Sequence, residues 1–162
     1  MKRNVYRILG CFLFAFTLCI MTPSFAKASV KNIPQTKTSG TYVGNVDLTG
    51  DENADSVIIR TTPDQEGWYI NHFTIYLNGK RTTEISLRDH DCYDLTVKYA
   101  KMSTQHTFIQ IIGRGENDYV TYNEIFTYNK KSNQFRVVKS FNNRSSYAEE
   151  IVTANKKGIT VK

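Results

Sequence analysis

The sequence has few residues that cross-link or interrupt a chain, with three cysteines and three prolines among 162 residues. It also lacks a long apolar run. Its longest uncharged apolar segment, 8–21, has 14 residues, whereas a membrane-spanning helix needs about 20. From residue 40 onward, apolar residues do not recur at helical spacing beyond a single turn, so the sequence disfavours a helical fold. No transmembrane helix is expected in the mature chain.

The first 26 residues have the organisation of an export signal. Lys2, Arg3 and Arg7 precede the apolar run, no acidic residue is present, and small residues stand at both specificity positions for a cut after Ala26. We therefore expect 1–26 to be a signal peptide and the mature protein to be secreted or held in the cell envelope. Removing the three basic residues lowers the formal net charge from +6 to +3, which disfavours nucleic acid as a partner.

Cysteine usage after the signal excludes an intramolecular disulfide. Cys11 and Cys19 lie inside the signal, which leaves Cys92 alone in the mature chain. The domain is therefore expected to be held together by core packing. The sequence places no activating partner with Cys92, and we interpret it as a small buried residue instead of a nucleophile.

Residues 27–39 are polar, carry Pro34 and show no periodicity, and we interpret them as a flexible linker. From residue 40 to residue 162, alternating patterns rich in Tyr, Thr, Ile, Val and Phe predict a single all-β domain of about seven to nine strands. Asn78-Gly79 predicts a type I′ hairpin turn. The connections favour an antiparallel meander that forms a curled sheet, a sandwich or a barrel-like domain. Strands are expected within 40–46, 55–62, 68–77, 80–88, 93–99, 104–113, 119–128, 134–141 and 149–162.

One segment has a pattern typical of ion binding. Side chains with oxygen atoms occupy every second position of this segment: Asp47, Thr49, Asp51, Asn53 and Asp55. Calcium takes about six to eight hard oxygen ligands, and Gly50 permits the sharp turn that such a loop needs. Three carboxylates so close in sequence repel one another unless a cation neutralises them. The pattern predicts a calcium site, and the alternative is a polar turn whose aspartates cap backbone groups.

The segment 47–55 resembles the Asp-x-Asp-Gly-Asp-x-x-x-Asp calcium loops of dockerins and of FG-GAP/VCBS repeats. In those repeats the loop leads directly into a β-strand, as the apolar run after residue 55 does here. The resemblance implies a structural calcium ion. Its side-chain ligands would be Asp47, Asp51 and Asp55, and Asn53 would bind it through the backbone carbonyl. Thr49 stands where those loops have a second aspartate, and one copy of the loop is present.

The residues around His90 suggest an enzymatic alternative. Asp89 and Asp91 flank His90, which would act as a general base oriented by one of them in a small secreted hydrolase. Adjacent side chains of a strand point to opposite faces, which favours a polar loop in this region instead. His72 and His106 fall within expected strands and would join His90 only if the fold converges them.

Aromatic residues suggest a carbohydrate binder. Trp68 lies near Tyr69 and Tyr76, and a second group contains Tyr119, Tyr122 and Tyr128. Such rings form platforms for sugars, although tyrosine is also favoured in strand packing. The partner is expected to be a cell-envelope polymer or another protein. Basic residues gather in the C-terminal third at expected turns, which favours a solvated face, with anionic wall polymers, lipid head groups or nucleic acid as the alternative partners: Lys130, Lys131, Lys139, Arg144, Lys156, Lys157 and Lys162. Without a complete catalytic set, the sequence favours a non-catalytic interaction module with a structural calcium loop.

Overall fold

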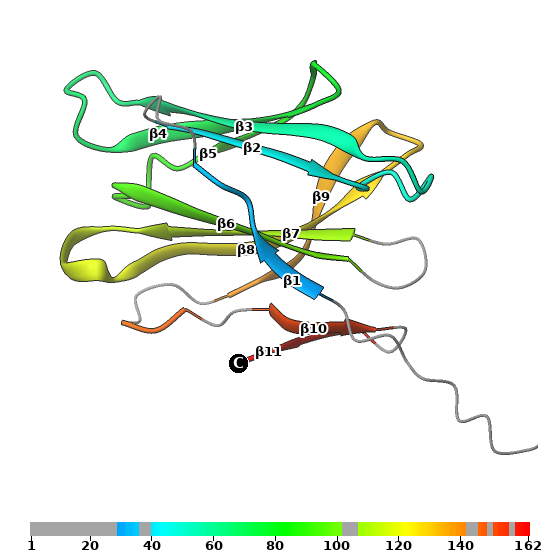
Figure 1. Ribbon diagram of the computed structural model, residues 1–162. Helices are drawn as coiled ribbons and strands as arrows, with labels where there is room; N and C mark the ends of the chain where they lie inside the picture. Colours follow the sequence, from blue (N-terminus) through cyan, green and yellow to red (C-terminus); the bar gives the residue numbers. More distant parts are fainter. Residues whose placement is uncertain (1–28, 36–39, 102–106, 142–145, 149–150, 156–157) are drawn as a thin grey trace, which may run out of the picture.

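A computed structural model describes residues 29–35, 40–101, 107–141, 146–148, 151–155 and 158–162 (Figure 1). Within these residues the chain is all-β, as the alternating patterns predict, with one short 3-10 turn at Glu116–Asp118. The expected export signal lies outside the described residues. No helix in the described part of the chain is long and apolar enough to cross a membrane. The strands are β1 (Ser29–Asn32), β2 (Thr41–Val46), β3 (Asp55–Pro63), β4 (Ile70–Leu77), β5 (Lys80–Ser86), β6 (Asp94–Lys101), β7 (Thr107–Arg114), β8 (Val120–Asn129), β9 (Gln134–Ser140), β10 (Ile151–Asn155) and β11 (Gly158–Val161).

Two antiparallel sheets pack face to face as a sandwich. One sheet has four strands in the order β2-β3-β4-β5, and the other has five in the order β1-β6-β7-β8-β9. Figure 1 shows them as stacked layers with the four-stranded sheet uppermost. Of the three forms expected for the meander, the described chain therefore takes the sandwich.

The core lies between the sheets and follows from the two-residue alternation in the sequence. On β3, Val57 and Ile59 are fully buried, and Ile109 of β7 lies in the same core. Phe73 of β4 meets Phe126 of β8 edge to face, with 6.3 Å between ring centroids. These contacts across the two layers remove large apolar side chains from water and stabilise the sandwich.

The turn between β4 and β5 is the predicted hairpin turn. Asn78 and Gly79 have φ values of 50° and 76°, and a type I′ turn needs positive φ at both positions. The Asn78 side chain also contacts the start of β3. Its Oδ1 accepts the backbone N–H of Ser56 at 2.8 Å, and its Nδ2 donates to Asp55 at 2.9 Å. The turn therefore supports the loop that the sequence marks as a candidate ion site.

Residues 29–35 belong to the sandwich, so the prediction of a flexible linker over 27–39 is wrong for this stretch. β1 pairs with β6, and the backbone N–H of Ile33 donates to that strand at 2.9 Å. Two residues later, Gln35 pairs with β2, so the segment joins an edge of one sheet to an edge of the other. The Ile33 side chain is 3% exposed in the core, and its burial stabilises this link. The rest of the predicted linker lies outside the described residues.

The outer face of the five-stranded sheet is buried as well. Gln110 of β7 and Asn123 of β8 are 0% and 1% exposed, although they alternate with residues that face the core. Gln110 Nε2 donates to Asn123 Oδ1 at 2.8 Å, as buried polar groups require. Figure 1 shows the β10–β11 hairpin on this side, away from the four-stranded sheet. The hairpin thus adds a third layer.

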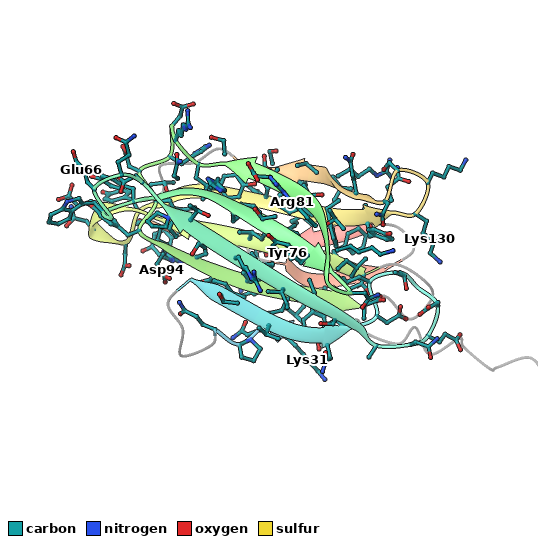
Figure 2. The ribbon with its side chains drawn as sticks, turned by 90° about the horizontal axis from the view of Figure 1, so that it is seen from above. Lys31, Glu66, Tyr76, Arg81, Asp94 and Lys130 are labelled. Atoms are coloured by element: carbon teal, nitrogen blue, oxygen red, sulfur yellow. The ribbon has the colours of Figure 1, made fainter. Side chains whose placement is uncertain are left out.

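The antiparallel connections gather at two opposite ends of the sandwich. We name the Trp68 end after the connections at 64–69, 87–93 and 115–119, and the Lys130 end after those at 47–54, 78–79 and 130–133. Figure 2 shows Glu66 and Lys130 at opposite extremes of the molecule. The eight residues of β7 run from one end to the other and span about 27 Å at roughly 3.4 Å per residue.

Candidate functional site

The two ends of the candidate calcium loop are fixed by the loop's own backbone. Asp47 is buried, and its carboxylate accepts N–H bonds at 2.7, 3.2 and 3.2 Å from Gly50, Asp51 and Glu52. Asp55 is also buried and accepts N–H bonds at 2.9 and 2.8 Å from Leu48 and Thr49. Bonds from several N–H groups stabilise a carboxylate charge strongly. These two predicted ligands therefore hold the turn together in the absence of an ion.

The other predicted ligands lie between these two aspartates. Asp51 and Asn53 are exposed, and the backbone N–H of Asn53 donates to Asp51 at 2.9 Å, which holds the pKa of that carboxyl below its ordinary value. The Thr49 hydroxyl also lowers the pKa of the Asp51 carboxyl. Its Oγ1 atom is buried, and no described residue forms a hydrogen bond of normal geometry with it. No group of three or more His, Cys, Asp or Glu side chains in the described residues is placed to hold a metal ion.

His90 is held by the five-stranded sheet and not by its neighbouring aspartates. Its Nδ1 donates to the Thr121 carbonyl at 2.7 Å, and its ring lies edge-on to Tyr122 with 5.2 Å between centroids. Asp89 and Asp91 are exposed and make no hydrogen bond or ion pair with His90 in the described part of the chain. The structure thus does not bring together the dyad of the hydrolase hypothesis.

The other catalytic candidates are separated too. His72 alternates with core residues on β4 and faces away from the core, and His106 lies outside the described residues. Cys92 is fully buried, and its Sγ donates to the Asp94 carbonyl at 3.1 Å. Burial raises the pKa of the Cys92 thiol to about 11. The prediction of a buried cysteine is confirmed, and such a thiol is not a nucleophile near neutral pH.

The Trp68 end carries a hollow of about 390 Å³. Trp68 is 68% exposed and lines it with Tyr69 and Tyr93, whose rings stack with 4.7 Å between centroids. The Tyr93 hydroxyl donates to that of Tyr69 at 3.3 Å. Gln35 and Asp94 add polar groups to the lining. This aromatic hollow combines flat apolar rings with a few hydrogen-bonding groups, a composition typical of ligand sites.

The β3–β4 loop presents Trp68 in a defined position. Asp64 Oδ1 accepts the backbone N–H of Trp68 at 2.9 Å, and the Asp64 N–H donates to the Tyr69 carbonyl at 2.8 Å. Gly67 has a φ of 77°, a conformation that L side chains rarely adopt. The exposed indole therefore stands on a closed turn. Such preorganisation lowers the entropy that a site loses on binding.

Only some of the aromatic residues named in the sequence analysis belong to this hollow. Tyr76 lies under Arg60 with 5.1 Å from the guanidinium carbon to the ring centroid, and Tyr122 is buried in the core. Tyr93 was expected to lie within a strand, but β6 begins at Asp94 and leaves Tyr93 in the preceding connection. The polar stretch 88–91 shortly before Tyr93 is the sequence signal for that connection.

Comparisons of the chain with protein-family models, with curated proteins and with solved structures found no match. Charge gives the remaining indication of the ligand. The connections of the Trp68 end and the strand ends beside them hold two arginines, Arg88 and Arg114, against a larger set of acidic residues: Asp64, Glu66, Asp89, Asp91, Asp94, Glu116 and Asp118. The aromatic hollow therefore lies in a negative field, which favours neutral or cationic ligands over anions.

Proposed function

We propose that this protein is an exported, non-catalytic binding module that holds a neutral glycan in the aromatic hollow. The observation that carries the proposal is Trp68, an indole that is 68% exposed on a closed turn. A contiguous exposed apolar surface often marks a binding site. The C–H faces of sugar rings carry partial positive charge and stack on the electron-rich faces of aromatic rings. A glycan chain would fit the cell-envelope polymer that the sequence suggests as a partner.

The polar groups of the hollow suit the hydroxyl edge of a sugar. Asp94 accepts hydrogen bonds, and the Gln35 amide both donates and accepts them. The Tyr42 hydroxyl lies 3.5 Å from Asp94 Oδ1 and donates to the Leu95 carbonyl, which anchors this side of the hollow. With the acidic surroundings, these groups favour an uncharged sugar over a uronic acid.

The test uses Trp68 as its own reporter, because it is the one tryptophan of the chain. Neutral cello-oligosaccharides and N-acetylchito-oligosaccharides are titrated while tryptophan emission is recorded. We expect a blue shift with one of the two series and a dissociation constant of about 10⁻⁵–10⁻³ M. Tyr93→Ala should weaken binding by about tenfold, since an aromatic contact contributes roughly 1.5 kcal/mol.

Tyr76→Ala is the matched control, because this tyrosine lies outside the aromatic hollow. It should leave the titration unchanged. Calorimetry with Trp68→Ala, which removes the fluorophore, should show no binding. An emission spectrum that neither series shifts, or an equal loss of affinity in Tyr76→Ala and Tyr93→Ala, would contradict the proposal.

We further propose that calcium stabilises the loop between β2 and β3. The supporting observations are the buried Thr49 Oγ1 without a normal hydrogen bond and the exposed Asp51 carboxylate beside it. Both are hard oxygen ligands of the kind that calcium takes. With a dissociation constant of about 10⁻³ M, calcium at about 10 mM would add roughly 1.4 kcal/mol to the free energy of unfolding.

Thermal unfolding in calcium, in magnesium and in chelator measures this effect. Calcium should raise the melting temperature by a few degrees, and Asp51→Ala should remove the increase. Asp64→Ala serves as a carboxylate control at the opposite end of the sandwich. Equal melting temperatures in calcium and chelator would rule out the ion and leave the glycan proposal untouched.

A further inference from the structure

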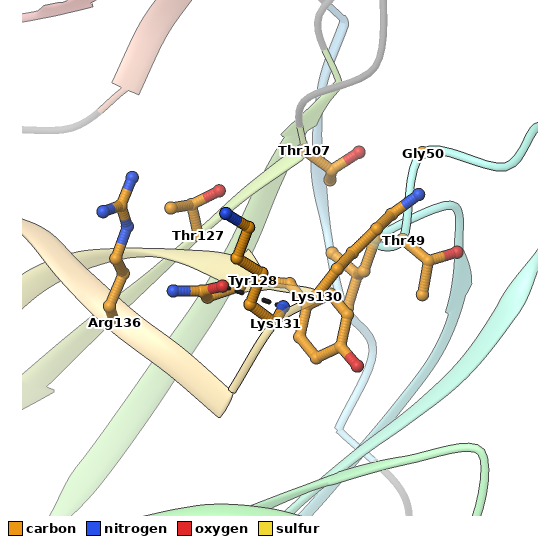
Figure 3. Close-up of a pocket in the computed structure, with 10 residues that line it drawn as sticks. Thr49, Gly50, Thr107, Thr127, Tyr128, Lys130, Lys131 and Arg136 are labelled. Carbon is orange, nitrogen blue, oxygen red and sulfur yellow. Dashed lines mark hydrogen bonds between the residues drawn. The ribbon is translucent and has the colours of Figure 1, made fainter. Parts of the chain in front are cut away.

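The Lys130 end has a larger hollow, of about 490 Å³, between the β2–β3 loop and the β8–β9 hairpin. Three basic residues line it, and none of its described lining residues is acidic. Figure 3 shows the hydroxyl and basic side chains around the opening. We call it the cationic hollow and define it by Thr49, Thr107, Thr127, Lys130, Lys131 and Arg136.

The hairpin that carries the two lysines has a fixed tip. Asn129 Oδ1 accepts the backbone N–H of Lys131 at 3.0 Å (Figure 3). The Tyr128 hydroxyl donates to Asn133 Oδ1 at 2.5 Å, and Asn133 has a φ of 53° that closes the turn. These side-chain bonds to neighbouring groups are typical of stable turns. The backbone positions of Lys130 and Lys131 are therefore set before any ligand arrives.

Arg136 and Thr127 stand directly opposite each other in the β8–β9 ladder. Residues so paired have Cβ atoms about 5 Å apart on the same face of a sheet. The Arg136 guanidinium and the Thr127 hydroxyl therefore reach the same part of the cationic hollow. The guanidinium and the hydroxyl therefore add hydrogen-bond donors of defined direction to the two lysine ammonium groups.

The described residues do not neutralise the positive charges of the hollow. In the part of the chain that the structure describes, Lys130, Lys131 and Arg136 form no ion pair and no side-chain hydrogen bond. One wall contains the β2–β3 loop. The Asp47 carboxylate is engaged by three backbone N–H groups of that loop, and Asp51 and Glu52 do not line the hollow. Like charges gathered without a counter-charge attract an anion.

We propose that the cationic hollow binds a phosphate ester. A phosphate monoester carries a charge of about −1.5 to −2 at pH 7 and presents three acceptor oxygens. Arginine binds phosphate through two parallel N–H bonds, and lysine acts as a mobile point charge. The three cations and the Thr127 hydroxyl supply donors for all three acceptor oxygens, and the positive charge of the hollow is large enough to compensate the charge of the monoester. A lone carboxylate, with one negative charge, would leave most of the positive charge uncompensated.

Calorimetric titration with glycerol 3-phosphate at low ionic strength tests the site. We expect a dissociation constant of about 10⁻⁴–10⁻³ M. The double variant Lys131→Gln/Arg136→Gln should bind at least about tenfold more weakly, because charged hydrogen bonds to the phosphate are lost. Both side chains are exposed, so this variant is expected to keep the fold.

The matched control is Lys80→Gln/Lys139→Gln, which removes the same charge from exposed residues outside the hollow. Its affinity should change by less than about twofold. A glycerol phosphate oligomer in a second titration distinguishes a polymer, whose consecutive phosphodiesters each carry one negative charge, from a small monoester, and binding of either supports the site. Absence of heat with both ligands, an equal loss in the control variant, or equally tight binding of gluconate would overturn the proposal.

Discussion

Cys92 is fully buried, and burial raises the pKa of its thiol to about 11. In the unfolded chain the thiol ionises near its ordinary value of 9.0. Between these two values the unfolded state loses a proton that the folded state keeps, so the free energy of unfolding falls as pH rises. We expect Cys92 to account for a loss of about 2 kcal/mol between pH 9 and pH 11, measured by urea unfolding.

Cys92→Ala isolates this contribution, because the buried tyrosines that also ionise at high pH remain in the variant. Its stability should fall less steeply with pH than that of the wild-type protein, whatever its stability at pH 7. Parallel slopes in the two proteins would show that the thiol ionises equally in the folded and unfolded states.

Gly113 on β7 is placed where a side chain would collide with Cys92. An added Cβ would lie 2.7 Å from Cys92 Sγ and 3.0 Å from the Tyr122 Cβ. Gly113→Ala should therefore destabilise the fold by about 1–3 kcal/mol. The same substitution in a Cys92→Ala background should cost about 1 kcal/mol less, because the sulfur is gone. Urea unfolding of the four proteins of this cycle gives the coupling, and additive effects would contradict the predicted contact.

At the scale of the element, the loop between β2 and β3 divides its carboxylates into two roles. Asp55 is buried and bonded to two N–H groups and to Asn78, whereas Asp51 is exposed. In chelator, Asp55→Asn should lower the free energy of unfolding by about 2–3 kcal/mol, since an amide replaces the charged acceptor. Asp51→Asn should change it by less than about 0.5 kcal/mol. A large effect of Asp51→Asn without calcium would refute this division.

Most strands could be predicted from the sequence because they alternate apolar and polar residues over enough positions or, like β7, form a nearly continuous apolar run. β8 was expected over 119–128 and spans Val120–Asn129. β1 was missed because its four residues, Ser29–Asn32, are too few to show a period. Its attachment depends on Ile33, one buried side chain that follows the strand. Short edge segments of this kind are specified by tertiary pairing instead of local pattern.

The candidate sites were predictable to a smaller extent, since each combines residues far apart in the chain. Trp68 could be named as a candidate from its residue type alone. Tyr93 lines the same hollow but follows β4 and β5 in the chain, so its position beside Trp68 depends on the fold. The cationic hollow likewise needs the β2–β3 loop and the β8–β9 hairpin side by side. Composition located the basic residues of the C-terminal third, and only the packing of the sheets shows which of them share a hollow.

At the scale of the whole molecule, the two hollows differ in charge. Acidic connections surround the aromatic hollow at the Trp68 end, and basic residues line the hollow at the Lys130 end. Figure 2 shows these ends at opposite extremes of the strands. A polymer with neutral sugars and phosphate groups would meet both ends with complementary chemistry. The molecule would then act as a link between two positions of such a polymer.

The two hollows should bind independently, because about 27 Å of packed sheet separates them and their lining residues are different. Saturation with the neutral oligosaccharide should change the affinity for glycerol 3-phosphate by less than about twofold, or roughly 0.4 kcal/mol of coupling. Trp68→Ala should abolish binding of the oligosaccharide and leave binding of glycerol 3-phosphate unchanged. Lys131→Gln/Arg136→Gln should weaken binding of glycerol 3-phosphate and leave binding of the oligosaccharide unchanged. Calorimetry of each ligand in the presence and absence of the other measures the coupling. A change of more than about fivefold would mean that the sandwich transmits a conformational difference from one end to the other.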